Sequence, residues 1–106
     1  MKLGHNYYVY IIECNDKSYY TGVTNDLDRR IWEHNNSDVV SYTSNRRPVI
    51  LRYFQRFLDI NYAIAFEKQL KSWSRKKKEA LFEEDWEKIK MLAKSRKDNP
   101  PSTSSG

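Results

Sequence analysis

The sequence has a single cysteine, Cys14, among its 106 residues. An internal disulfide and a zinc site built from cysteines are therefore excluded. No stretch approaches the roughly 18 consecutive apolar residues that a membrane helix requires. The N-terminal segment MKLGHNYYVY lacks the anatomy of a signal peptide, because its apolar run is short and ends at Glu13. We therefore expect a cytoplasmic protein with no membrane partner.

The chain also has little excess charge: 19 Lys and Arg face 14 Asp and Glu, which gives a net charge of +5 and a pI of about 9.3. This moderate basicity allows a polyanionic partner without requiring one. The charges are unevenly distributed, since residues 66–78 hold six basic residues and one acid, whereas residues 79–87 hold five acids and no base. Arginines interleaved with eight tyrosines suit a nucleic-acid surface, and a solvated basic surface over an aromatic core is the open alternative.

Hydrophobic residues make up 39% of the chain, enough for one core, so we expect a single domain over residues 1–93 and a disordered polar tail over 94–106. β-branched and aromatic residues predict a strand over 7–13 that is buried on both faces, and further strands over 18–23 and 49–57. Asn25 is expected to cap a helix that ends near His34, and Asp59 a helix that ends near Trp73. Ser74 begins a lysine-bearing helical segment, and the spacing of the apolar residues from 86 to 93 is also helical. The order ββαβαα predicts an α+β fold, an α/β sandwich in which helices cover a small three-stranded sheet.

Polar residues occupy apolar positions in both main helices. Arg30 and His34 fall in the same helical sector as the apolar residues Leu27 and Ile31. They are either functional groups at the sheet or, alternatively, a snorkelling arginine and a satisfied histidine at a helix end. Glu67 likewise lies inside the apolar stripe of its helix, which is expected to consist of Ile60, Ala63, Phe66 and Leu70. It predicts either a buried ion pair with Arg30 or a lysine, or a lone-carboxylate site for a hard divalent ion.

The expected hairpin places Tyr10 and Tyr20 opposite one another to within one position. They share a face of the sheet only if the connecting loop has an odd number of residues. Two phenols on one face suggest a polar site, and an aromatic pair in the core is the alternative. Gly22, two residues after Tyr20, indicates a bulge or a close approach of backbone or ligand.

These residues resemble the GIY-YIG nuclease superfamily. Tyr8-Val9-Tyr10, nine intervening residues and Tyr20-Thr21-Gly22 resemble its two signature triads, with Arg30 eight residues after Gly22 and His34 four residues later. The segments YTGVTNDLDRRIWEHN, RRPVILRYF and AIAFEKQLKSWSRKKKEAL look like the small stand-alone bacterial proteins of that superfamily. The resemblance covers residues 7 to about 86. Tyr8 stands where the family name has a glycine, a position at which the small bacterial proteins vary.

The resemblance implies a three-stranded antiparallel sheet flanked by helices. It also implies an endonuclease that hydrolyses phosphodiester bonds with one Mg²⁺ or Mn²⁺ ion, on DNA more readily than on RNA, in DNA repair or processing. A protein partner or a homodimer is left open. By similarity, Glu67 would hold the metal and Arg30 the scissile phosphate. Tyr10 would orient or deprotonate the attacking water.

Other residues receive supporting roles from the same resemblance. Tyr20 would bind the phosphate or the nucleophile, and His34 would assist proton transfer. The expected nucleic-acid contacts are Tyr42, Arg46, Arg47, Lys76, Lys77 and Lys78. Two alternatives stay open: a non-catalytic nucleic-acid-binding module that retains the fold, and an interaction protein that docks through the acidic segment 79–87.

Overall fold

The computed structural model describes residues 6–36 and 43–95. The chain divides between Ser72 and Trp73 into two compact units. We call them the sheet unit, which ends at Ser72, and the helical unit, which begins at Trp73, and describe each by itself. No helix in the described part of the chain is long and apolar enough to cross a membrane.

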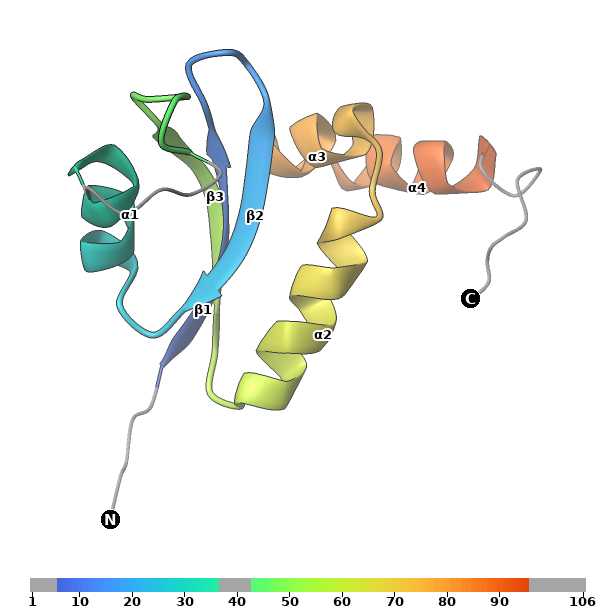
Figure 1. The fold of residues 1–106 in the computed structure, drawn as a ribbon. Coiled ribbons are helices and arrows are strands. Elements are labelled where there is room, and N and C mark those ends of the chain that lie inside the picture. Colours follow the sequence, from blue (N-terminus) through green and yellow to red (C-terminus); the bar gives the residue numbers. More distant parts are fainter. Residues whose placement is uncertain (1–5, 37–42, 96–106) are drawn as a thin grey trace. The chain divides into compact units, whose positions relative to one another are not determined.

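The sheet unit is built on three antiparallel strands in the order β2-β1-β3 (Figure 1). They are β1 (Tyr7–Glu13), β2 (Tyr19–Thr24) and β3 (Ile50–Phe57). The central strand, β1, is the most apolar, and its residues from Val9 to Ile12 are buried. The antiparallel sheet and the two-sided burial of its first strand confirm the prediction from the sequence.

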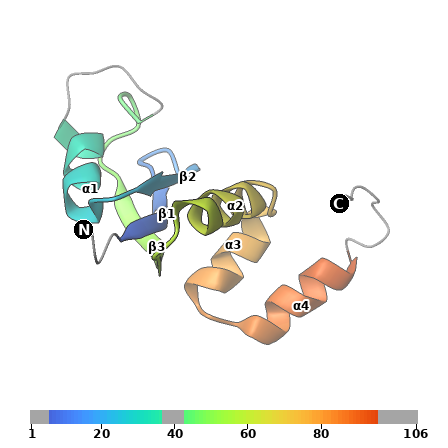
Figure 2. The same ribbon diagram turned by 90° about the horizontal axis from the view of Figure 1, so that it is seen from below.

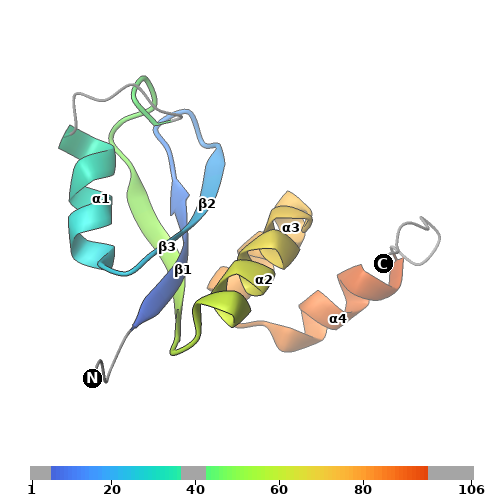
Figure 3. The same ribbon diagram turned by 60° about the horizontal axis from the view of Figure 1, so that its bottom comes forward.

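One helix covers each face of this sheet, as Figures 1 and 3 show. Helix α1 (Leu27–Asn36) packs Leu27 and Ile31 against a core that contains Tyr10 and Ile12. We call this side the α1 face. Helix α2 (Ile60–Lys71) packs against all three strands, and the rings of Phe57 and Phe66 lie 5.4 Å apart.

The face that α2 covers, the α2 face, carries Val9 and Ile11 of β1. The expected apolar stripe of α2 is correct at Ala63 and Leu70, which are fully buried. It is wrong at Ile60, which remains 36% exposed in the first turn of the helix. This position follows the end of β3 too closely to reach the core.

The helix caps agree with expectation at α2 and differ at α1. Asp59 caps α2 by accepting a hydrogen bond from the Asn61 backbone N–H at 2.8 Å. The expected cap of α1, Asn25, is wrong by one residue, because the Asp26 side chain accepts from the Arg29 N–H at 3.2 Å. A carboxylate at this position both satisfies a free N–H group and complements the helix dipole.

The helical unit contains α3 (Arg75–Phe82) and α4 (Trp86–Ser95), which Figure 2 shows as separate helices. Ser74 caps α3 as predicted, through a hydrogen bond from the Lys77 N–H at 3.2 Å. The expected order ββαβαα is one helix short, because Glu84, with φ of 55°, interrupts the helical path before α4 begins. Helix α4 extends to Ser95, and the expected tail beyond it lies outside the described residues.

Candidate active site

Tyr10 lies at the centre of the α1 face, where it is fully buried. Its partner across the sheet is Gly22 of β2. A Cβ atom at Gly22 would lie 2.6 Å from the phenol oxygen and 2.8 Å from Cζ, so the ring rests where any other residue would place a side chain. The close approach expected at Gly22 is therefore made by Tyr10, and it fixes the position of the phenol.

Tyr20 joins Tyr10 on the same face, although the two are not directly opposite. The loop between β1 and β2 has five residues, Cys14 to Ser18, and pairs Tyr20 with Ile12. This odd number places both tyrosines on the α1 face, and their ring centroids lie 6.4 Å apart. The shared face confirms the prediction. The expected opposition to within one position is wrong, because the register offsets each tyrosine from the other by two residues.

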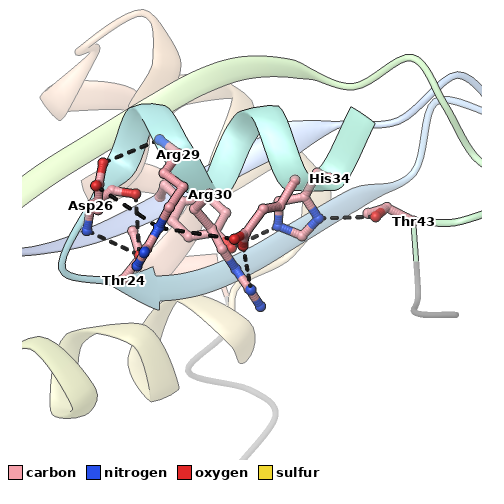
Figure 4. A network of polar contacts seen from close by, with 8 residues as sticks. Thr24, Asp26, Arg29, Arg30, His34 and Thr43 are labelled. Atoms are coloured by element: carbon pink, nitrogen blue, oxygen red, sulfur yellow. Dashed lines mark hydrogen bonds and ion pairs between the residues drawn. The ribbon is translucent and has the colours of Figure 1, made fainter. Parts of the chain in front are cut away.

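His34 projects from α1, and Figure 4 shows its ring linked to Thr43. The side chain of His34 is buried. Its ring centroid lies 5.8 Å from that of Tyr10 and 5.3 Å from that of Tyr20. Its Nε2 atom lies 2.8 Å from the Tyr10 hydroxyl, and its Nδ1 atom lies 2.9 Å from Oγ1 of Thr43. The three side chains form a continuous buried hydrogen-bonded chain, Tyr10–His34–Thr43.

The sequence alone did not point to Thr43. It is fully buried, in the segment that precedes β3, and it satisfies the ring nitrogen of His34 that faces away from Tyr10. Threonine in a polar loop carries no periodic signal, so only the fold reveals that it orients a histidine. Its neighbour Tyr42, an expected nucleic-acid contact, lies outside the described residues.

Burial governs the ionisation of this chain. Desolvation raises the pKa of Tyr10 to about 12, although the Arg30 guanidinium acts in the opposite direction. Smaller increases in this pKa come from the charges of Tyr20 and Glu67. Desolvation also lowers the pKa of His34, and the positive charge of Arg30 lowers it further. At neutral pH both the phenol and the imidazole are therefore uncharged.

A neutral imidazole has one donor and one acceptor nitrogen, so the two hydrogen bonds of His34 run in the same direction along the chain. We assign the Tyr10 hydroxyl as donor to Nε2 of His34, which leaves the Nδ1–H of His34 to donate to Thr43. In this arrangement the phenol oxygen keeps its lone pairs for an incoming donor, and the imidazole is ready to receive a proton.

Arg30 supplies the positive charge beside this chain. A hydrogen bond with the Tyr10 side chain raises the pKa of Arg30. The Arg30 guanidinium also forms an ion pair with Glu33 at 3.2 Å. The Arg30 side chain is 45% exposed, in contrast to Tyr10 and His34. Arg30 can therefore reach a ligand from solvent, whereas Tyr10 and His34 are buried.

Glu67 contributes a carboxylate from α2. Its side chain is 15% exposed and pairs with Lys71, one helical turn later, at 3.0 Å. The sequence left the partner of Glu67 open between Arg30 and a lysine. The structure shows the lysine, because Arg30 pairs with Glu33. An ion pair with a partner as exposed as Lys71 is worth about 0–1 kcal/mol, so a cation competes with it easily.

The other expected contacts are dispersed. Arg46 pairs with Asp16 at 3.0 Å, and Arg47 donates from Nε to the His34 backbone carbonyl at 2.8 Å, beside the buried chain. The three lysines lie on α3 in the helical unit. Lys76 is exposed, and Nζ of Lys77 lies 4.3 Å from the Trp73 ring centroid. Burial, followed by the charge of Arg75, lowers the pKa of Lys78.

The chain is similar to several known proteins. The family model of the GIY-YIG catalytic domain matches residues 6–80. A UPF0213 protein of Haloquadratum walsbyi is 46% identical over 74% of this chain and 88% of its own, and one of Bacillus pumilus is 44% identical over 76% and 82%. The solution NMR structure of protein EF2693 from E. faecalis is 34% identical, with a TM-score of 0.55, and the match covers 78% of this chain and 88% of that one.

Proposed function

The chain belongs to the GIY-YIG catalytic domain family, and we propose that it is a divalent-metal-dependent endonuclease that hydrolyses phosphodiester bonds in nucleic acid, with DNA favoured over RNA. The observation that carries this proposal is the buried chain Tyr10–His34–Thr43 beside the half-exposed Arg30. It combines a proton acceptor, a polar hydroxyl and an anion-binding group within one face of a sheet. These are the groups that hydrolysis of a phosphodiester requires.

Arg30 binds the scissile phosphate in this proposal. A guanidinium matches two phosphate oxygens and neutralises the charge that develops on them during attack. Its present partner, Glu33, is 37% exposed, so exchanging this ion pair for a phosphate costs little. The Tyr20 phenol, on the same face, donates to a further phosphate oxygen.

Tyr10 and His34 act on the nucleophile. The Tyr10 oxygen accepts a hydrogen bond from the attacking water and orients it. As the water loses a proton to Tyr10, the phenol passes its own proton to Nε2 of His34, so the charge is never left on the buried phenolate. Because Tyr10 has no exposed surface, this contact requires Arg30 to turn outward onto the phosphate.

Glu67 is the residue that would hold a divalent ion. Among the described residues no three His, Cys, Asp or Glu side chains come together, so Glu67 fits the ion only as one ligand beside water and phosphate oxygens. The ion, when bound, would stabilise the charge on the phosphate and on the leaving oxygen. Lys71 would be displaced from the carboxylate, and its exposed position allows that.

The direct test is a cleavage assay on labelled branched, single-stranded and duplex substrates, with Mg²⁺ or Mn²⁺ against a chelator. We expect cleavage that requires the metal, and Glu67→Gln should lose it because an amide binds a hard cation poorly. Lys71→Ala is the matched control, since it removes the same ion pair and keeps the carboxylate. Loss of cleavage in both variants would show that the ion pair, and not a metal, is what matters at Glu67.

A second function is favoured by one observation. The complete burial of Tyr10 suits a module that binds nucleic acid without turnover. Such a module binds the same substrates and cleaves none of them with either metal, so the same assay separates the two functions.

A further inference from the structure

Beside Tyr10, the α1 face continues as an aromatic surface that the proposed chemistry does not use. Tyr8 precedes Tyr10 by two residues on β1, so both side chains point to this face, about 7 Å apart along the strand. On β3, Phe54 pairs with Tyr10 and Arg56 pairs with Tyr8. Cross-strand partners share a face, which places all four side chains together.

The two new rings form a contact of their own. The ring centroids of Tyr8 and Phe54 lie 6.1 Å apart in an edge-to-face arrangement. The core under α1 contains Tyr10 and Ile12 with Leu27 and Ile31, and does not include these two rings. Phe54 is 50% exposed, so the pair is open to a ligand. Phe54 is half-exposed and Tyr8 is partly buried, so the pair presents an accessible aromatic surface next to the buried site.

The charge of this surface selects its ligand. Arg56 is exposed beside the pair and donates to the Asn6 side chain at 2.9 Å, and Arg30 lies at the Tyr10 end. The strand residues that the register places on the α1 face include no carboxylate; they are Tyr8, Tyr10, Ile12, Tyr20, Gly22, Thr24, Leu51, Phe54 and Arg56. Aromatic rings flanked by arginines suit a flat base joined to phosphates.

We propose that Tyr8 and Phe54 form a binding site for one unstacked nucleobase, next to the phosphate that Arg30 holds, with Arg56 on a neighbouring phosphate. The site rests on the proposed function, because it takes the substrate of the same face. It lies one β-strand repeat from Tyr10, which is within the reach of the sugar and base of a single nucleotide. Stacking tolerates all four bases, so this site selects for an accessible base and not for sequence.

The test measures binding without cleavage, by fluorescence anisotropy of a labelled unstructured oligonucleotide in the presence of a chelator. Tyr8→Leu and Phe54→Leu keep apolar bulk and lose the aromatic face. We expect each to weaken binding about tenfold. Tyr62→Leu is the matched control, because Tyr62 is a 69% exposed aromatic residue on α2, which covers the other face of the sheet, and it should leave binding unchanged. Equal affinity of all three variants and the wild type would overturn the proposal.

A second measurement needs no altered protein. Wild type should bind a fully abasic oligonucleotide of the same length more weakly than the complete one, and the difference should be smaller for Phe54→Leu. Equal affinity of wild type for the two oligonucleotides would also overturn the site. DNA and RNA versions of the pair show which sugar is accepted. If the protein cleaves its substrate and neither Tyr8→Leu nor Phe54→Leu changes binding, the base site alone is refuted. If binding depends on a base but no metal-dependent cleavage occurs, the endonuclease activity alone is refuted.

Discussion

The two faces of the sheet are built from the same three strands and are used differently. The α2 face is closed by apolar contacts, with Val9, Ile11, Ala63 and Leu70 fully buried. The α1 face buries polar groups as well, in the chain Tyr10–His34–Thr43, and leaves arginine and aromatic side chains open beside it. Every second residue of β1 faces each side, so one strand supplies both a core and a site. The difference indicates that the α2 face contributes mainly to stability, whereas the α1 face carries the polar groups of the proposed site, to which α2 adds only the Glu67 carboxylate.

The largest effect expected on stability comes from the α2 face. Leu70→Ala should lower the free energy of unfolding by about 2–5 kcal/mol, because it leaves a cavity under a fully buried side chain. Chemical denaturation measures this loss. Ile64→Ala on the same helix, where Ile64 is 37% exposed, is the control and should cost much less. Both variants should cleave as wild type does well below the melting temperature. A loss of cleavage in folded Leu70→Ala would break the division between the faces.

The next effect is alkaline destabilisation through the α1 face. The pKa of Tyr10 rises from 10.0 to about 12 on folding, so the unfolded chain loses this proton first as the pH rises. Stability should therefore fall between about pH 10 and 12, by about 3 kcal/mol in total. Tyr10→Phe should flatten this part of the profile. An unchanged alkaline profile in Tyr10→Phe would show that the phenol is not desolvated.

His34 acts in the opposite pH range. Its pKa is lowered in the folded state, so below about pH 6.5 the unfolded chain binds the proton more readily. Stability should fall as the pH drops through this window, and His34→Gln should remove that dependence. The two buried groups together predict greatest stability between about pH 7 and 10. An NMR titration that gives His34 its ordinary pKa would contradict this prediction.

Gly22→Ala should act on both stability and chemistry, with a smaller loss of about 1–3 kcal/mol. The added Cβ overlaps the Tyr10 phenol, and the buried ring must shift away from His34. Cleavage should fall more than the melting temperature suggests, since the hydrogen bond to His34 is lost. Unaltered cleavage by Gly22→Ala would mean that the exact place of the phenol is unimportant.

The smallest expected effect on stability is that of Thr43→Val, at about 1 kcal/mol, because it keeps the shape and leaves Nδ1 of His34 without its hydroxyl partner. The chemical step should slow more than binding does, since the imidazole is no longer held in one orientation. Thr43→Ser, which restores the hydroxyl, should recover the rate. Equal rates for the Val and Ser variants would assign Thr43 to packing alone.

The sequence predicted most of the fold because its signals were local. The β-branched and aromatic residues of β1 and the capping residues Asp59 and Ser74 led directly to the observed elements. The break at Glu84 and the cap at Asp26 were misplaced, because neighbouring residues offer nearly equal caps and turns.

The site was predicted in part. The shared face of Tyr10 and Tyr20 followed from strand alternation together with their spacing. The role of Thr43 and the burial of Tyr10 depend on contacts between distant segments, which no local pattern encodes. The pair of Glu67 with Lys71 lies within one helix, at a spacing of four residues, and the sequence left its partner open between Arg30 and a lysine.

The most direct test of the central claim compares two adjacent arginines of α1. Both pair with Glu33, but only Arg30 acts on Tyr10, whereas Arg29 is 63% exposed and also pairs with Asp26. The measurement is single-turnover cleavage of a labelled oligonucleotide with Mg²⁺ by Arg30→Ala and Arg29→Ala, both shown to be folded by thermal denaturation. We predict a fall of about 100-fold or more for Arg30→Ala and a change within about twofold for Arg29→Ala. Equal rates for the two variants would contradict a phosphodiester site on the α1 face.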